Sequence, residues 1–158
     1  MFRIGFGNDV HRLAAGRALI IGGVEIESEF GADGHSDADV LLHAVTDAIL
    51  GALALGDIGT HFPNSDERWK DADSSVFLVR AAELAAERGF HIENIDSTVS
   101  LERPKLRPHI DEMRSSIGGL IGVDVGSVSV KAKTGEGLDA VGTGEAIRAE
   151  AVVLMRQN

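Results

Sequence analysis

The stretch ALIIGGVEIESEFGADGHSDADVLLHAVTDAILGALAL (residues 18–55) contains three successive patterns that predict the fold class. Residues 18–27 predict two short strands joined at Gly22-Gly23, because paired glycines between apolar runs are typical of a tight hairpin. Residues 28–36 predict a polar loop. Residues 37–55 predict a helix, since apolar side chains recur every three or four positions and share one face. A hairpin followed by such a helix indicates a sheet with a helix packed on it.

The same patterns continue outward along the chain. Strands are predicted over residues 3–12, 90–102, 127–134 and 146–155, and helices over 74–88 and 108–121. Residues 56–73 are long and irregular, which is typical of a functional loop, and residues 135–144 are a glycine-rich loop. We therefore expect one α+β domain spanning residues 1–158, with a single mixed β-sheet and helices packed on it.

Composition excludes several classes of function. The chain has 158 residues, a formal net charge of −10, no Cys and no Tyr. This charge opposes binding to nucleic acid or to an anionic membrane, and the lack of Cys excludes disulfides and thiolate metal sites. The longest nearly uncharged stretch, Val40 to Leu55, is interrupted by His43 and Asp47 and does not predict a membrane span. The first residues do not resemble a signal peptide, so we expect a cytoplasmic protein.

Asp9 and His11 form the strongest local signal for chemistry. Residues two apart in a strand point to the same side, so this carboxylate and imidazole could hold one divalent ion. The alternative is a polar strand end facing solvent. His43, on the predicted helix, offers a third ligand. Three ligands would leave one position of a zinc tetrahedron open, which is typical of catalytic rather than structural zinc.

Two carboxylates flank His43 on its helix. Asp39 lies four residues before it and Asp47 four residues after it, on the same helical face. A zinc-bound histidine usually donates its second ring N–H to a carboxylate, so either Asp is a candidate partner. The alternative is a half-buried histidine that is hydrogen-bonded to one Asp and binds no metal.

Three further polar clusters have a functional and an ordinary interpretation. His35 and Ser36 precede a helix N-terminus, where an anion or a simple helix cap would fit. Residues 103–106 read Arg-Pro-Lys-Leu, which suits a ligand-binding turn or a solvated one. Residues 131–137 end a strand in a glycine loop; Thr134 and Glu136 there could serve a metal-bound diphosphate, although a hairpin loop would look the same.

Taken together, the motifs resemble a known family over essentially the whole chain. They are G-x-G-x-D-x-H from Gly5, H-S-D-x-D from His35, H-A-x-T-D-A from His43, L-G-D-I-G-x-x-F-P from Leu55, R-P-K from Arg103, T-x-E from Thr134 and G-x-G-E from Gly142. The sequence resembles the 2-C-methyl-D-erythritol 2,4-cyclodiphosphate synthases of the non-mevalonate isoprenoid pathway. These lyases convert 4-diphosphocytidyl-2-C-methyl-D-erythritol 2-phosphate to the cyclic 2,4-diphosphate and release CMP.

The resemblance also implies an assembly and a set of site residues. It implies a homotrimer with active sites between subunits, zinc on Asp9, His11 and His43, and a second ion, Mg²⁺ or Mn²⁺, on Glu136. His35 and Thr134 would position and stabilise the reacting phosphates. The implied substrate-binding residues are Ser36, Asp57, Ile58, Gly59 and Phe62 near the sugar and phosphates, and Leu101, Pro104, Lys105, Leu106, Ala132 and Lys133 at the cytosine.

This chain departs from the family pattern in its last loop and leaves two other functions open. Many members have Phe where Ala140 stands, and an Arg associated with diphosphate binding in a central trimer cavity where Thr143 stands. We therefore expect isoprenoid diphosphates to bind weakly in such a cavity. The alternatives to the synthase are a non-catalytic, metal-stabilised trimeric protein that binds phosphorylated ligands, and a metal-dependent phosphohydrolase.

Overall fold

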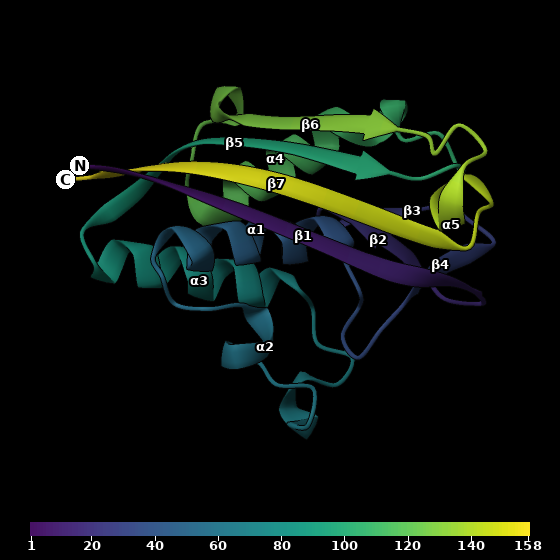
Figure 1. The fold of residues 1–158 in the computed structure, drawn as a ribbon, viewed down its shortest axis with the longest axis horizontal. Helices are drawn as coiled ribbons and strands as arrows, with labels where there is room; N and C mark the ends of the chain where they lie inside the picture. Colours follow the sequence, from purple (N-terminus) through teal and green to yellow (C-terminus); the bar gives the residue numbers. More distant parts are fainter.

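A computed structural model describes residues 1–158 as a five-stranded sheet with helices on one face (Figure 1). The strand order is β4-β1-β7-β5-β6; β5 and β6 are parallel and all other neighbours are antiparallel. The α+β class with a mixed sheet is thereby confirmed. The elements are β1 (Phe2–Ala15), β2 (Leu19–Ile21), β3 (Val24–Ile26), β4 (Phe30–Asp33), α1 (Val40–Ala52), α2 (Ile58–His61), α3 (Ser75–Glu87), β5 (Phe90–Ser100), α4 (Ile110–Ile121), β6 (Val128–Lys133), α5 (Asp139–Gly142) and β7 (Ala146–Gln157), with 3-10 turns at Glu67–Trp69, Arg107–His109 and Val125–Ser127.

Helices α1, α3 and α4 lie on the same face of the sheet and enclose the hydrophobic core (Figure 1). Alternate residues of β7, from Ile147 to Met155, point into this core. The opposite face has no covering layer within the chain. Ile4, Phe6 and Val10 of β1 therefore remain 72%, 59% and 55% exposed.

Helix α1 approaches β1 closely because β1 has glycine at the two facing positions. A Cβ atom on Gly5 would lie 1.8 Å from the carbonyl oxygen of Ala48, and one on Gly7 would lie 2.1 Å from that of Ala44. No larger side chain fits at these positions while the helix stays in place. The two glycines therefore set the separation between α1 and the part of β1 that continues to Asp9.

Two expectations about the sheet are wrong. The predicted hairpin forms, with positive φ angles at Gly22 and Gly23, but β2 and β3 make a separate two-stranded sheet and do not join the main one. Residues 28–36 are not all loop, because β4 pairs with the end of β1. That pairing joins Arg12 to Asp33 and Ala15 to Phe30. Strand β4 has only four residues, which is too short for an alternating apolar pattern to show in the sequence.

The first helix begins later than predicted, at Val40, because Asp39 caps it. The Asp39 side chain accepts hydrogen bonds from the backbone N–H groups of Leu41 and Leu42, and also from those of Gly22 and Gly23 in the hairpin turn. Burial raises the pKa of Asp39 to about 6, although the N–H donors oppose this shift. Asp39 thus joins the hairpin to the start of α1.

No helix of the structure has the length and apolar character that crossing a membrane requires.

Candidate metal centre

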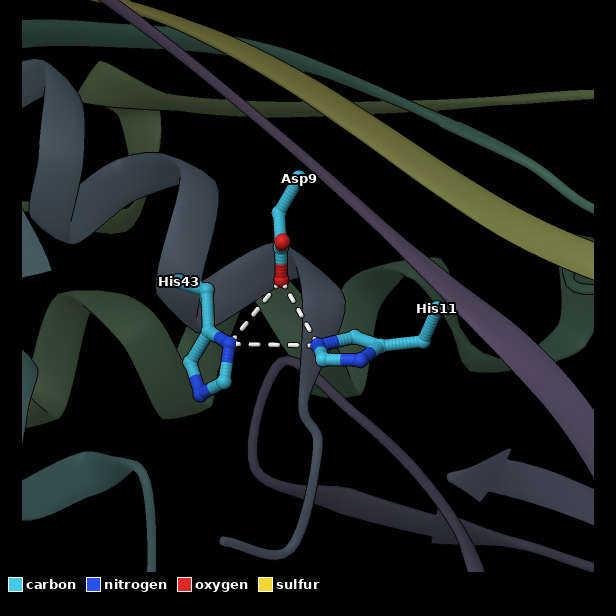
Figure 2. A group of neighbouring side chains, drawn as sticks. All are labelled: Asp9, His11 and His43. Atoms are coloured by element: carbon cyan, nitrogen blue, oxygen red, sulfur yellow. Dashed lines mark hydrogen bonds and ion pairs between the residues drawn. The ribbon is translucent and has the colours of Figure 1, made fainter. Parts of the chain in front are cut away.

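Asp9, His11 and His43 converge where α1 meets β1 (Figure 2). Asp9 Oδ2 lies 2.8 Å from His11 Nε2 and 2.9 Å from His43 Nδ1, and the two nitrogens are 3.3 Å apart. Ligand atoms around a tetrahedral zinc ion are about 3.3 Å from one another, given zinc–nitrogen distances of about 2.0 Å. The three side chains therefore fit one such ion with little movement.

The electrostatics of the triad also suit a cation. Burial alone would raise the pKa of Asp9, but hydrogen bonds from His11 and His43 and the charges of these residues lower it to about 2. Burial likewise opposes protonation of His11, yet the hydrogen bond to Asp9 and its charge raise the His11 pKa above its ordinary value. The carboxylate thus stays ionised and attracts positive charge, which a metal ion would supply in place of the protons.

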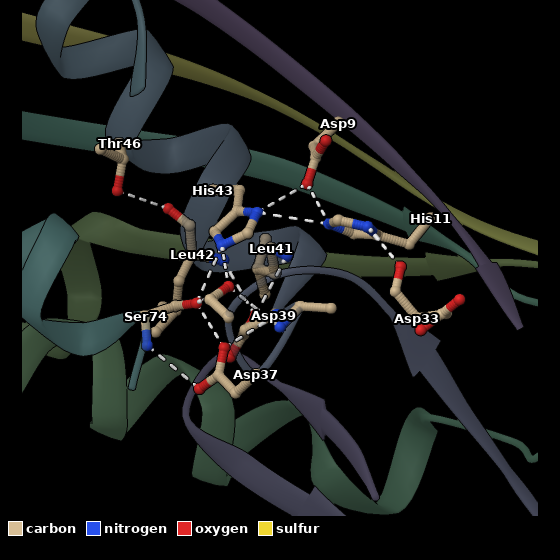
Figure 3. A network of polar contacts seen from close by, with 12 residues as sticks. Asp9, His11, Asp33, Asp37, Asp39, Leu41, Leu42, His43, Thr46 and Ser74 are labelled. Atoms are coloured by element: carbon tan, nitrogen blue, oxygen red, sulfur yellow. Dashed lines mark hydrogen bonds and ion pairs between the residues drawn. The ribbon is translucent and has the colours of Figure 1, made fainter. Parts of the chain in front are cut away.

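The outer nitrogen of each histidine has a polar partner, and the partners of His43 are not the predicted ones (Figure 3). His11 Nδ1 donates to the carbonyl oxygen of Asp33, at 3.1 Å. His43 Nε2 lies 2.8 Å from Ser74 Oγ and 3.2 Å from Ser36 Oγ. With the outer nitrogens held in this way, His11 Nε2 and His43 Nδ1 point toward the candidate ion.

Neither predicted carboxylate partner of His43 holds its outer nitrogen, so this prediction is wrong. Asp39 is engaged by the hairpin turn and the first turn of α1. The Asp47 side chain accepts the backbone N–H of Ile58 at 2.7 Å and so fixes the start of α2. Asp39 thus fixes the hairpin turn to α1, and Asp47 fixes the start of α2 to α1.

A cavity of about 330 Å³ opens beside the triad. It is lined by the three candidate ligands and by most of the residues predicted for the sugar and phosphates, namely His35, Ser36, Ile58, Gly59 and Phe62. Gly34, Asn64, Trp69 and Phe77 complete the lining. His35 Nε2 is buried and has no hydrogen-bond partner, which leaves it available to a ligand. Asp57 is outside the lining, and its side chain caps α2 by accepting the N–H of Thr60.

The residues predicted for the cytosine line a second cavity, of about 440 Å³. Its walls come from residues 101–107, Ile110 and β6: Leu101, Pro104, Lys105, Leu106, Arg107, Ile110, Val130, Lys131, Ala132, Lys133 and Thr134. The Thr134 hydroxyl donates to Glu136 at 2.8 Å, so these two predicted residues form a pair. Strand β6 is one edge of the sheet, whereas β1 lies beside the opposite edge strand. A single chain therefore does not bring the two groups of predicted residues together.

Sequence reasoning missed the contact of Ser74 with His43 and the aromatic wall of the metal cavity. Ser74 stands at the start of the helix predicted over residues 74–88, where a serine ordinarily serves as the helix cap. The rings of Phe62, Trp69 and Phe77 contact one another, with centroids 4.6–5.8 Å apart. The available signal was the presence of three aromatic residues within a chain that has few.

The fold and the site define an α+β protein with a candidate three-ligand metal centre and a second, separate ligand-sized cavity. A family model, the YgbB family, matches residues 2–156, and the chain belongs to this family.

Named relatives agree over nearly the full length. The chain is 58% identical over 155 residues to the 2-C-methyl-D-erythritol 2,4-cyclodiphosphate synthase of Geobacter sulfurreducens, covering 98% of this chain and 99% of that protein. It is 57% identical over 149 residues to the synthase of Salinibacter ruber, covering 94% and 95%. A solved synthase in its CDP-bound form superposes with a TM-score of 0.90 at 42% identity, covering 98% of this chain and 100% of that one.

Proposed function

We propose that this chain is a lyase of isoprenoid biosynthesis that converts 4-diphosphocytidyl-2-C-methyl-D-erythritol 2-phosphate to 2-C-methyl-D-erythritol 2,4-cyclodiphosphate. An oxygen of the 2-phosphate attacks the β-phosphorus, the bond from that phosphorus to the CMP oxygen breaks, and CMP leaves. The observation that carries the proposal is the triad of Asp9, His11 and His43 on one cavity, within a chain 58% identical to a named synthase. The CDP-bound relative supports a cytidyl substrate.

Each cavity has a distinct task in this reaction. A zinc ion on the triad would withdraw charge from the phosphates and orient the attack. His35, through its unpaired Nε2, and Ser36 bind the phosphates beside it, and Ile58, Gly59 and Phe62 form the wall against the sugar. Asp57, at the start of the same short helix, is proposed to bind sugar hydroxyls from the rim. No side-chain nucleophile is needed, because both reacting groups belong to one substrate molecule.

The second cavity is proposed to bind the nucleotide. Leu101, Pro104, Leu106 and Ala132 offer apolar walls and backbone groups for the cytosine, and Lys105 and Lys133 offer charge. Thr134 is proposed to stabilise the reacting diphosphate, and Glu136 to hold a second ion, Mg²⁺ or Mn²⁺. Carboxylate oxygen is the ligand that such hard cations prefer.

The two cavities are proposed to meet between subunits of a homotrimer. Two observations support this assembly. The nucleotide cavity and the metal cavity lie toward opposite edges of the sheet, and the uncovered sheet face exposes Ile4, Phe6 and Val10. Apolar side chains gathered on one face are typical of an interface between subunits. The cytoplasmic location expected from the sequence stays a prediction.

Incubation with the cytidyl substrate, zinc and Mg²⁺ tests the proposed reaction. Release of CMP together with the cyclic product is expected, and ³¹P NMR distinguishes the cyclic from a linear diphosphate. A linear product would instead indicate the phosphohydrolase. Binding of zinc and substrate without turnover would indicate the non-catalytic binding protein. Neither alternative is favoured by the names of the relatives.

A further inference from the structure

The Ser74 side chain does not cap the helix that follows it but contacts the candidate metal ligand His43. Ser74 directly precedes α3, where a serine hydroxyl ordinarily accepts an N–H of the first helical turn. Ser74 makes no such bond. Its Oγ lies 2.8 Å from His43 Nε2 and donates to Asp37 Oδ1 (Figure 3). Ser74 is fully buried, so its hydroxyl contacts His43 and Asp37 instead of solvent or the helix backbone.

Asp37 fixes the direction of this chain of hydrogen bonds. Its two carboxylate oxygens receive the backbone N–H groups of Asp39 and Ser74, each at 3.1 Å, as well as the Ser74 hydroxyl. An ionised carboxylate only accepts, so the Ser74 proton points to Asp37 and the lone pair of Ser74 Oγ faces His43. His43 Nε2 must then donate to Ser74 Oγ, so Nδ1, which lies 2.9 Å from Asp9 Oδ2, is the nitrogen left to bind an ion in place of its proton.

We propose that Ser74 and Asp37 are positioning residues for the metal centre: Asp37 orients the Ser74 hydroxyl, and Ser74 holds His43 in the tautomer that binds the ion through Nδ1. This inference rests on the metal site of the proposed function. Ser36 Oγ is a weaker candidate for the same task, since it is 3.2 Å from His43 Nε2 and also accepts the N–H of Ala38.

The same contact also joins the metal ligand to the loop that carries His35. The backbone N–H of Asp37 donates to Ala72 at 3.0 Å, and the N–H of Asp71 donates to the carbonyl of His35 at 2.8 Å. Residues 35–37 and 71–74 are thus bound to each other beside the cavity. Loss of the Ser74 hydroxyl should therefore alter His43 first, while the backbone contacts of the loop remain.

Zinc affinity of the full-length, metal-free protein tests this role. Zinc alone is titrated in competition with a chromogenic chelator, for wild type and for Ser74→Ala, Ser74→Thr, Asp37→Asn and His43→Ala. Ser75→Ala, a neighbouring serine that lines neither the metal cavity nor the nucleotide cavity, is the matched control. We expect Ser74→Ala to weaken zinc binding by about 10- to 100-fold, as removal of an outer partner of a metal-bound histidine does elsewhere. Ser74→Thr, which keeps the hydroxyl, and Ser75→Ala should retain wild-type affinity.

The Nε2–H group of His43 supplies a second readout that a merely structural role would not move. In the zinc-bound wild type, ¹H–¹⁵N NMR should show a slowly exchanging His43 Nε2–H, because it donates to the buried Ser74 hydroxyl oxygen, and Asp37→Asn and Ser74→Ala should each shift this signal and speed its exchange. Zinc affinity of Ser74→Ala within twofold of wild type, or an unchanged Nε2–H signal in both variants, would overturn the proposal. Failure of the wild type itself to bind zinc would instead contradict the metal site, so the two failures are distinguishable.

Discussion

At the scale of single residues, His43 joins the helix layer to the sheet at the metal centre. We predict that His43→Ala abolishes stoichiometric zinc binding and activity while the chain remains folded, because the core is built from apolar side chains elsewhere. Elemental mass spectrometry measures the zinc content, and circular dichroism measures the secondary structure. His91→Ala, which removes an exposed histidine paired with Glu93, is the control and should keep its zinc. Retained zinc in His43→Ala would contradict the ligand assignment.

Lys105 lines the nucleotide cavity, away from the triad. We predict that Lys105→Ala raises KM several-fold while kcat changes little, because a remote binding contact stabilises ground and transition states alike. Steady-state kinetics of CMP release measure both parameters. Lys70→Ala, an exposed lysine that lines neither cavity, should behave as wild type. A fall in kcat at unchanged KM would place Lys105 in the chemical step.

Asp39 accepts four backbone N–H groups with its two oxygens. In Asp39→Asn an amide NH₂ replaces one acceptor and leaves a buried donor unpaired, so we predict a loss of about 1–3 kcal/mol in the free energy of unfolding. Urea denaturation measures this loss. Asp124→Asn, at an exposed turn where the side chain accepts the N–H of Gly126, should change the free energy far less. Equal effects of the two substitutions would mean that burial of Asp39 is unimportant.

Sequence patterns indicated the candidate metal ligands more clearly than the residues that contact them. Asp9 and His11 share a strand face, and His43 stands out in an apolar helix, so local periodicity was sufficient. Ser74 reaches His43 only because residues 56–73 fold back over the site, and no local pattern encodes that path. Asp39 was predicted to lie on the helical face of His43 and to bind its outer nitrogen. The helix begins one residue later, so Asp39 caps it instead.

At the scale of elements, the geometry of the metal centre depends on the separation of α1 and β1. We predict that Gly7→Ala destabilises the protein by about 1–3 kcal/mol and weakens zinc binding, because the new methyl group would force the helix away from the strand. Urea denaturation and zinc titration measure these effects.

The control for this substitution is Gly119→Ala on α4, where an added Cβ meets nothing within 4 Å. That substitution should leave zinc binding unchanged and stabilise the protein by about 0.5–1 kcal/mol, since alanine is the better helix former. If Gly7→Ala bound zinc as wild type does, the close approach would not determine the site.

Long, regular elements were predictable and short ones were not. Helices α3 and α4 and strands β5, β6 and β7 lie within a few residues of the predicted ranges, since each has a periodic apolar face. Strand β4 and the short helices α2 and α5 fell in predicted loops. Their positions depend on tertiary partners, such as the Asp47 carboxylate that accepts the N–H of Ile58 at the start of α2.

At the scale of the whole molecule, the uncovered face of the sheet is the surface on which the proposed trimer depends. We predict that Phe6→Glu yields monomers with little activity, because a charge replaces an apolar side chain at the subunit contact. Sedimentation equilibrium measures the assembly. Val76→Glu, which adds the same charge at an exposed site of α3, should leave the assembly intact. A Phe6→Glu protein that sediments as wild type would exclude this face as the interface.

The pairing of β1 with β7 has a consequence for synthesis on the ribosome. The two strands pair from Phe2–Arg156 to Arg12–Ala146, and the N–H of Gln157 donates to the carbonyl of Met1 (Figure 1). Asp9 and His11 stand opposite Ala149 and Ile147, so the strand that carries two of the three candidate metal ligands lacks this neighbour until residues 146–157 have emerged. The nascent chain therefore holds β1, with its apolar side chains, unpaired to β7 while more than a hundred residues are added, and the frame of the candidate site is completed only after β7 is synthesised.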